Sequence, residues 1–309
     1  MISIVTPTHK KTKLWSVTVE SVMNQTYKDF EWIVLDNSKE GYFESEFEVF
    51  KKGHPEYSDV FDNVKIYHEY YEGRHPVAFY KNKCIEHTTC KPDEFVVTLD
   101  HDDLLVRTAL EDFVGCSDKY GSLIDYIFGY EYVVDDDKTI NIPSHLLVMP
   151  NTVKTTLPNL KFGKSDFYID SFNVEMPEVT SIDLTSYTNQ LIGSHPRVIR
   201  RYLFDRLPFK YNECDYYEDD TLQTMFAILF LNVGYICRPT VVYVRYTDEV
   251  DKNESANVRS DEDMRTHDNI HKGLCILYEA MRTVYPDNIL KRPYFYYNNE
   301  DFKTSLEND

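Results

Sequence analysis

The stretch Asp100-His101-Asp102-Asp103 is an acidic cluster that could hold a divalent cation. It follows the apolar run Phe95–Leu99, which predicts a buried strand. The carboxylates are thereby delivered to the carboxyl end of a strand, the edge at which open α/β sheets bind their ligands. Neighbouring carboxylates repel one another, and a hard cation bound to phosphate oxygens would relieve that repulsion. The simpler interpretation is that these acids cap the helix that follows.

The predicted elements before this cluster alternate between strands and helices. Apolar runs predict strands over 2–6, 31–35, 64–67 and 95–99, and helical spacing predicts helices over 13–23 and 76–87. This order predicts a mostly parallel sheet with helices on both faces. Right-handed crossovers would then place Pro7, Thr8 and Asp36 along the same edge as the acidic cluster. Three strand ends that converge on one edge favour a functional site more than any single motif does.

The rest of the chain gives weaker patterns. It predicts a helix over 107–120, strands over 126–134 and within 236–246, a basic and partly helical segment over 196–204, helical spacing from Asp219, and a final helix over 268–285. The segment 39–62 is polar and aromatic, and 141–190 is weakly periodic and is expected to form loops. An exposed turn is expected at 135–138 and an acidic loop at 248–263, and the chain from Pro286 is interpreted as a tail.

The composition limits the classes of partner. A formal net charge of −19 over 309 residues argues against nucleic acid or an anionic membrane as a general partner. An anionic small substrate is still compatible, because a cation or a local basic cluster can reverse the field. The six cysteines form no CxxC pair, so no zinc or redox motif is expected, and their scattering is typical of a cytoplasmic protein. No signal peptide or transmembrane segment is expected, and the chain is predicted to be soluble or peripheral to a membrane.

The order of the motifs resembles that of family 2-type glycosyltransferases, which have the GT-A fold. The similar residues are Ile2–His9, Ser21–Tyr27, Glu31–Ser38, Lys81-Asn82, Leu99–Asp103 and Tyr217–Leu222. The resemblance implies an α/β fold with a mostly parallel central sheet, flanking helices and a small antiparallel part on the acceptor side. It also implies a nucleotide-sugar-binding half over 1–110, an acceptor-binding and catalytic-base half over 111–250, and a C-terminal helical extension over 251–309.

The activity implied by the resemblance is inverting transfer of a sugar, expected to be a hexose, from a nucleotide-diphosphate donor to a hydroxyl group of a glycan or other acceptor. A UDP-sugar is the expected donor, and Mn²⁺ or Mg²⁺ is the expected cofactor. Asp100-His101-Asp102 matches the family's DXD motif. A cation held there would stabilise the charge that grows on the diphosphate leaving group. Asp102 is the expected metal ligand, and Asp100 would bind the ribose, or the metal through a water molecule.

The resemblance implies nucleotide-binding residues at several strand ends. Asp36 would accept a hydrogen bond from the base or the ribose, beside Pro7 and Thr8. Lys81 would neutralise the diphosphate, and His101 belongs to the same nucleotide-binding set. The simpler alternatives are that Asp36 caps the next segment and that Lys81 forms a salt bridge. Further basic candidates, for which surface salt bridges are the default interpretation, are Arg74, Arg197, Arg200 and Arg201.

The pair Glu218-Asp219 matches the family's ED motif. The resemblance implies that Asp219 is the general base, which removes the proton of the acceptor hydroxyl as that oxygen attacks the anomeric carbon. An aspartate with an ordinary pKa of about 4 is a weak base, so the neighbouring acids Glu218 and Asp220 would need to raise the pKa of Asp219. Capping of a helix N-terminus is the alternative role for these acids.

One position departs from the family pattern. Many relatives carry a histidine after the late strand, where it contributes to metal or phosphate binding. This chain reads Tyr243–Asp248 there, without a histidine. Asp248 could take its place, or Arg245 could do so through its charge. His101 and His195 are interpreted as local hydrogen-bonding residues and not as ligands, which leaves the remaining protein ligand of the metal open.

Two other functions stay open at the level of the sequence. A haloacid-dehalogenase-like phosphatase would use Asp100 and Asp102 as nucleophile and acid, and 218–220 as magnesium ligands. Against it, Leu104 stands where that motif usually has Thr or Val. The other alternative is a GT-A module that binds a sugar or nucleotide without turnover, and the intact Glu218-Asp219 pair argues against it.

Overall fold

The computed structural model describes residues 1–12, 14–73, 75–135, 195–205, 231–245 and 295–297, together with Gln223, Thr224, Ala227 and Ile228. Several predicted features lie outside these residues: Arg74, the acidic residues 218–220, Asp248, the segments 141–190 and 248–263, and the helix over 268–285. The four helical residues between 223 and 228 belong to the stretch for which helical spacing was predicted from Asp219.

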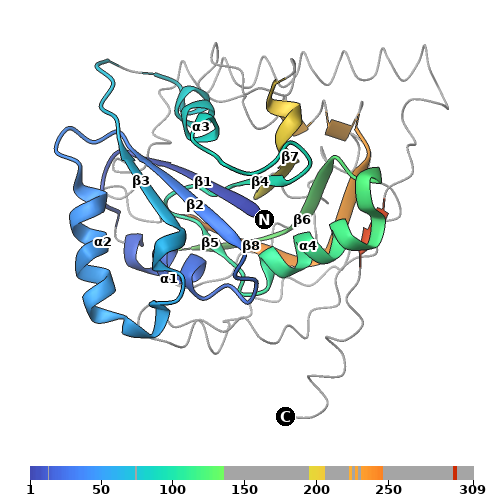
Figure 1. The fold of residues 1–309 in the computed structure, drawn as a ribbon, viewed down its shortest axis with the longest axis horizontal. Coiled ribbons are helices and arrows are strands. Elements are labelled where there is room, and N and C mark those ends of the chain that lie inside the picture. The colour runs from blue at the N-terminus through green and yellow to red at the C-terminus, as the bar shows by residue number, and fades with distance from the viewer. Residues whose placement is uncertain are drawn as a thin grey trace.

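A single twisted sheet runs through the described residues (Figure 1). Its strands are β1 (Ile2–Thr8), β2 (Phe30–Asp36), β3 (Val64–His68), β4 (Phe95–Thr98), β5 (Leu104–Leu105), β6 (Tyr126–Asp135), β7 (Arg197–Arg200), β8 (Val233–Arg245) and β9 (Phe295–Tyr297). The strand order is β3-β2-β1-β4-β7-β6-β8-β5, and β9 pairs with β8. β1 to β4 are parallel to one another, as are β6, β8 and β9, whereas β7 is antiparallel to both of its neighbours and β5 is antiparallel to β8.

Helices cover both faces of this sheet, as the alternating order predicts (Figure 1). They are α1 (Trp15–Met23), α2 (Tyr42–Gly53), α3 (Val77–Glu86) and α4 (Ala109–Tyr120). Successive strand residues point to opposite faces, so Val5 joins the core beneath α3 while Ile4 joins the core beneath α1, α2 and α4. Among the described residues, no helix has the length and apolar character that a membrane span requires.

The structure corrects four predictions about local elements. Residues 39–62 include α2, whose buried Phe43, Phe47 and Phe50 recur at helical spacing among charged residues. The segment predicted as partly helical contains the strand β7, followed by a short 3₁₀ helix over Arg201–Asp205. β9 lies within the predicted tail, and the strand β5 was not predicted.

The first strand also extends through Pro7, which was predicted to close it. β1 pairs with β4 only as far as Val5, so at Pro7 the strand is flanked by β2 alone. A proline, which has no amide hydrogen to donate, is tolerated where one side of a strand is not paired. The parallel register sets Thr8 opposite Asp36, and the Leu99 amide donates to the Val5 carbonyl at 3.0 Å. The carboxyl ends of β1, β2 and β4 therefore meet at one edge, as predicted.

Candidate functional site

The acidic cluster forms a turn between β4 and β5. The Asp103 amide donates to the Asp100 carbonyl at 3.1 Å, which closes the turn. Apolar residues on either side are buried, because β4 lies inside the sheet and Leu104 of β5 pairs with Val242 of β8. The turn is anchored at both ends, so its acidic side chains are held at the carboxyl edge of the sheet. Asp103 is buried within it, whereas Asp100 and Asp102 are partly exposed.

Lys81 lies directly beside this turn. It projects from the buried side of α3, is only 2% exposed, and its Nζ lies 3.6 Å from Oδ1 of Asp100. A buried ammonium group is costly unless it is paired with an opposite charge, and the Asp100 carboxylate provides one. The ion pair is the alternative role considered for Lys81, and its contact with a diphosphate stays a prediction.

Two further side chains, those of Arg197 at the start of β7 and of His195 just before it, lie on this side of the site. β7 runs antiparallel to β4 and sets Arg197 opposite Thr98, which brings His195 to the acidic turn. His195 Nε2 lies 3.7 Å from Oδ2 of Asp100. Arg197 is fully buried, and its guanidinium nitrogen lies 3.1 Å from the same Nε2. The imidazole also stacks on the ring of Tyr243 in β8, with centroids 5.7 Å apart and planes inclined by 18°.

Three of these side chains are grouped closely enough to hold a cation. Asp100, Asp103 and His195 each offer one ligand atom, and these atoms all lie within 4.8 Å of one another. Two ligands about 2.1 Å from one small divalent cation lie no more than about 4.2 Å apart, so only a small closure of the group is required. Carboxylate oxygens with one imidazole nitrogen are a donor set that suits a first-row divalent metal. These described residues therefore fit the expected metal.

The predicted ligand Asp102 is not a member of this group. Burial raises the pKa of the Asp102 carboxyl above its ordinary value, His101 opposes that shift, and the charge of Asp100 adds to it. Its role as a ligand stays a prediction. His195, in contrast, was interpreted as a hydrogen-bonding residue, and nothing in the local sequence pattern marks it as part of the site. Its position depends on the pairing of β7 with β4, two strands that are far apart along the chain.

His101 has a buried nitrogen without a local partner. Its ring meets the ring of His9 edge-on, with centroids 5.6 Å apart. Within the described part of the chain, His101 Nε2 is buried and has no hydrogen-bond partner. Such orphaned polar atoms are uncommon in proteins and occur at sites that a ligand or an ion completes. This observation is compatible with the predicted nucleotide contact of His101.

Asp36 performs the capping role that was the alternative to nucleotide binding. Its side chain is fully buried. Oδ1 accepts a hydrogen bond from the Ser38 amide and Oδ2 accepts one from the Phe43 amide, each at 2.8 Å. The carboxylate thereby fixes the turn after β2 and the first residues of α2. In this arrangement Asp36 fixes the loop at the edge of the site through two backbone hydrogen bonds. Its direct contact with a nucleotide stays a prediction.

The loops after β1, β2 and β3 are joined by hydrogen bonds at the same edge. The Asn37 amide donates to the Thr8 carbonyl at 2.7 Å, and Asn37 Oδ1 accepts from the Tyr71 amide at 2.8 Å. The hydroxyl of the buried Thr8 lies 2.5 Å from that of Tyr42, and the Tyr42 hydroxyl also donates to the Lys10 carbonyl at 2.7 Å. The backbone around Pro7 and Thr8 is therefore held rigidly beside the acidic turn.

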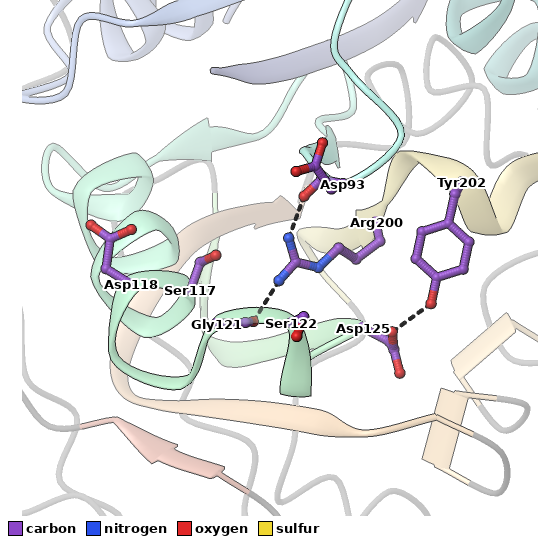
Figure 2. A pocket seen from close by; sticks show the side chains of 8 residues that line it. All are labelled: Asp93, Ser117, Asp118, Gly121, Ser122, Asp125, Arg200 and Tyr202. Carbon is purple, nitrogen blue, oxygen red and sulfur yellow. Dashed lines mark hydrogen bonds between the residues drawn. The ribbon is translucent and has the colours of Figure 1, made fainter.

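A cavity of about 470 Å³ lies at the opposite edge of the sheet (Figure 2). It is lined by Asp93, Ser117, Asp118, Gly121, Ser122, Asp125, Arg200 and Tyr202. Arg200 donates to the carbonyls of Ile124 and Gly121, both at 2.7 Å, and to that of Asp93. Its nitrogens are thus bonded to backbone carbonyls, and of the candidates named from the sequence only this arginine lines the cavity.

Comparison with known proteins identifies a matching family and similar structures. The family model described as Glycosyl transferase family 2 matches residues 3–206. No curated protein matches the chain. Among solved structures, S. aureus TarS 1-349 is similar, with a TM-score of 0.52 and 16% identity over 79% of this chain. Its complexes with UDP (TM-score 0.52, 17% identity, 79% of this chain) and with UDP-GlcNAc (0.51, 18%, 80%) are similar to the same degree.

The chain spans 60%, 60% and 59% of the length of these three TarS chains, respectively. At such identities the likeness shows the fold. Together with the observed sheet, it confirms the predicted fold class of a mostly parallel sheet with flanking helices and an antiparallel part.

Proposed function

The chain belongs to glycosyl transferase family 2 and has the GT-A fold, and from that premise we propose that it transfers a sugar from a nucleotide-diphosphate donor to a hydroxyl acceptor with inversion. The observation that carries this proposal is the acidic turn at the carboxyl edge of the sheet, with the buried Lys81 beside it. Membership of this family removes the support for a phosphatase. We propose a UDP-sugar as the donor, since the similar TarS structures include complexes with UDP and UDP-GlcNAc.

The donor is proposed to lie across the strand ends, with its diphosphate at the acidic turn. Asp100 and Asp103 would hold Mn²⁺ or Mg²⁺ there, with Asp102 as a further candidate ligand. When bound, the cation supplies electrostatic stabilisation of the charge on the departing diphosphate. Lys81 adds a fixed positive charge 3.6 Å from Asp100. His101, with its orphaned ring nitrogen, is proposed to contact the nucleotide.

The remaining nucleotide contacts are proposed at the joined loops. Pro7 and Thr8, at the end of β1, are proposed to contact the nucleotide beside the acidic turn. Asp36 holds the neighbouring loop in place through its two backbone hydrogen bonds. We propose that residues 1–110 bind the donor, that 111–250 carry the acceptor side and that 251–309 form an extension.

We propose Asp219, supported by Glu218, as the general base, on the strength of the sequence motif. Removal of the acceptor's proton by Asp219 allows the hydroxyl oxygen to attack the anomeric carbon as the bond to the diphosphate breaks. A single in-line displacement of this kind inverts the configuration at the anomeric carbon. General-base catalysis contributes about 10²- to 10⁴-fold to such reactions.

The proposal is tested with a panel of sugar nucleotides, the purified protein and Mn²⁺ or Mg²⁺. Release of the nucleoside diphosphate reports turnover, and calorimetry reports donor binding. Asp219→Asn is expected to abolish transfer while donor binding is retained, and Asp118→Asn, on the exposed side of α4, serves as the matched control. Absence of both donor binding and turnover across the panel would overturn the proposal. Donor binding without turnover by the unaltered chain would favour the non-catalytic module.

A further inference from the structure

We propose that His195 supplies the nitrogen ligand of the cation site, since the stretch 243–248 contains no histidine, and that Arg197 binds that nitrogen until the cation arrives. The inference rests on the proposed function, because it assigns a further residue to the same metal site. It goes beyond the sequence motifs, none of which includes His195 or Arg197.

The hydrogen bond between Arg197 and His195 fixes which ring nitrogen carries the lone pair. A guanidinium group only donates hydrogen bonds, so His195 Nε2, 3.1 Å from the Arg197 nitrogen, accepts. The ring proton of the neutral imidazole then resides on Nδ1. Nε2 therefore carries the lone pair that accepts from Arg197, and a neutral imidazole with its lone pair on this nitrogen is the form of histidine that ligates a metal.

His195 Nε2 also lies near another acceptor. Oδ2 of Asp100 lies 3.7 Å from Nε2, and a carboxylate oxygen cannot donate a hydrogen bond to it when Asp100 is ionised. Two acceptors at this separation repel each other unless a positive charge lies between or beside them. The guanidinium of Arg197 supplies that charge in the present arrangement, and a divalent cation bound by Asp100, Asp103 and His195 would supply more of it.

The imidazole is held in one orientation by contacts on two sides. Tyr243 stacks against its face at 5.7 Å, and Arg197 contacts its Nε2 edge. The stacking on Tyr243 does not occupy Nε2, so it orients the ring without competing with the metal, and a ligand oriented in advance loses less freedom on binding, which raises affinity. β8 thus still contributes to the site, but through the stacking ring of Tyr243 and not through a histidine of its own.

Arg197 and the cation use the same lone pair, and this makes them competitors. One sp² nitrogen cannot accept a hydrogen bond and ligate a metal at the same time, so entry of the cation must break the 3.1 Å contact. Arg197 is fully buried and permanently charged, so a metal bound at Nε2 would lie beside another positive charge. Arg197 is therefore a positioning residue that stabilises the metal-free site and weakens metal binding.

The test is a titration of the full chain with Mn²⁺ alone. Calorimetry measures the affinity, and pulsed electron paramagnetic resonance measures the coupling of bound Mn²⁺ to ¹⁴N. The unaltered protein is expected to show ¹⁴N coupling from one imidazole to bound Mn²⁺. His195→Ala is expected to lose that coupling and to bind Mn²⁺ at least about 10-fold more weakly. Arg197→Gln keeps a donor for Nε2 and removes the charge, so Mn²⁺ binding is expected to tighten about 10-fold.

Two controls keep the outcome interpretable. His54→Ala, at the end of α2, is expected to leave the coupling and the affinity unchanged, and circular dichroism checks that each variant is folded. Retention of the ¹⁴N coupling in His195→Ala, or its loss in His101→Ala, would overturn the assignment of His195. Weaker binding by a folded Arg197→Gln would overturn the competition. Because no donor is present, these results are independent of whether the chain transfers a sugar.

Discussion

The two ends of strand β7 bury an arginine in two different ways. Arg200, 7% exposed, donates to three backbone carbonyls, of which those of Asp93 and Gly121 are drawn in Figure 2. Its guanidinium group also lies over the ring of Phe95, 4.3 Å from the ring centroid. Arg197, three residues earlier, is fully buried and contacts the side chain of His195. The antiparallel register sets Arg200 opposite Phe95 at the start of β4 and Arg197 opposite Thr98 at its end. This four-residue strand therefore places one buried arginine at each edge of the sheet.

The same contrast extends along both edges. At the amino edge, the buried carboxylate of Glu31 accepts from Ser3 and Lys65 at 2.5 Å and from the amide and hydroxyl of Thr89 at 2.6 Å. At the carboxyl edge, Asp100 lies 3.6 Å from the ammonium group of Lys81 and 3.7 Å from the imidazole of His195.

Short bonds to fixed groups neutralise a buried charge permanently and favour stability. Longer contacts between charged side chains can be exchanged for contacts with a ligand. Burial of a charge therefore does not by itself identify a functional residue. The partners of the charge distinguish a functional role from a structural one.

The largest expected effect separates the two edges by activity. Asp100→Asn is expected to lower kcat/KM for transfer about 10³-fold, which corresponds to about 4 kcal/mol of lost transition-state stabilisation. The free energy of unfolding is expected to change by less than about 1 kcal/mol, because the side chain is 31% exposed. Nucleotide release and urea unfolding measure the two quantities. A variant that loses stability and keeps its activity would place Asp100 with the structural charges and break the comparison.

The next effect falls on stability at the amino edge. Arg200→Met leaves three carbonyls without their donor and is expected to lower the free energy of unfolding by about 3 kcal/mol. The affinity of the folded variant for UDP is expected to be unchanged in calorimetry. Arg201→Met is the control, since its ion pair with Asp205 lies at the surface and contributes less than about 1 kcal/mol. A drop in UDP affinity in Arg200→Met alone would show that the cavity in Figure 2 is coupled to the site.

The sequence predicted most of what local patterns determine. The strands that deliver the acidic turn, Asp36 and Thr8 were predicted from apolar runs, and their convergence followed from the handedness of crossovers. The position of His195 could not be predicted in the same way, because it depends on an antiparallel pairing between segments about 100 residues apart. Val198 and Ile199 are the only apolar residues of β7 and are flanked by arginines, so the strand has too few positions to reveal its period.

α2 was missed for a different reason. Its three phenylalanines carry the helical period, but the intervening acidic and basic residues make the segment polar on average. The spacing of these phenylalanines, and not the average polarity of the segment, is the signal that indicates the helix. The capping role of Asp36 depends on the same helix, which explains why the sequence alone did not distinguish it from nucleotide contact.

The amino edge also predicts a dependence of stability on pH. Burial disfavours the charged form of Glu31, but Lys65, Ser3 and Thr89 outweigh it, so the pKa of this carboxyl is lowered below its ordinary value of 4.5. Its stabilising contribution is therefore complete above about pH 4.5 and is lost as the pH falls through the folded-state pKa. Glu31→Gln is expected to cost about 2 kcal/mol at pH 7 and to flatten the pH dependence below 4.5 in urea unfolding. If the free energy of unfolding of Glu31→Gln depends on pH below 4.5 as that of the unaltered protein does, other carboxyl groups cause that dependence.

The smallest expected effect concerns Asp36, a buried carboxylate at the functional edge that accepts from two backbone amides. Asp36→Asn keeps one acceptor oxygen and turns an amide nitrogen toward a backbone N–H, so it is expected to lower the free energy of unfolding by about 1 kcal/mol. If Asp36 only positions the loop, UDP affinity should fall no more than in Ser38→Ala, which removes the hydroxyl that accepts from the Gly41 and Tyr42 amides of the same loop. A fall in UDP affinity confined to Asp36→Asn would instead indicate direct contact with the nucleotide. In that case the buried carboxylate must exchange a backbone partner for a ligand, as the charges around Asp100 are proposed to do.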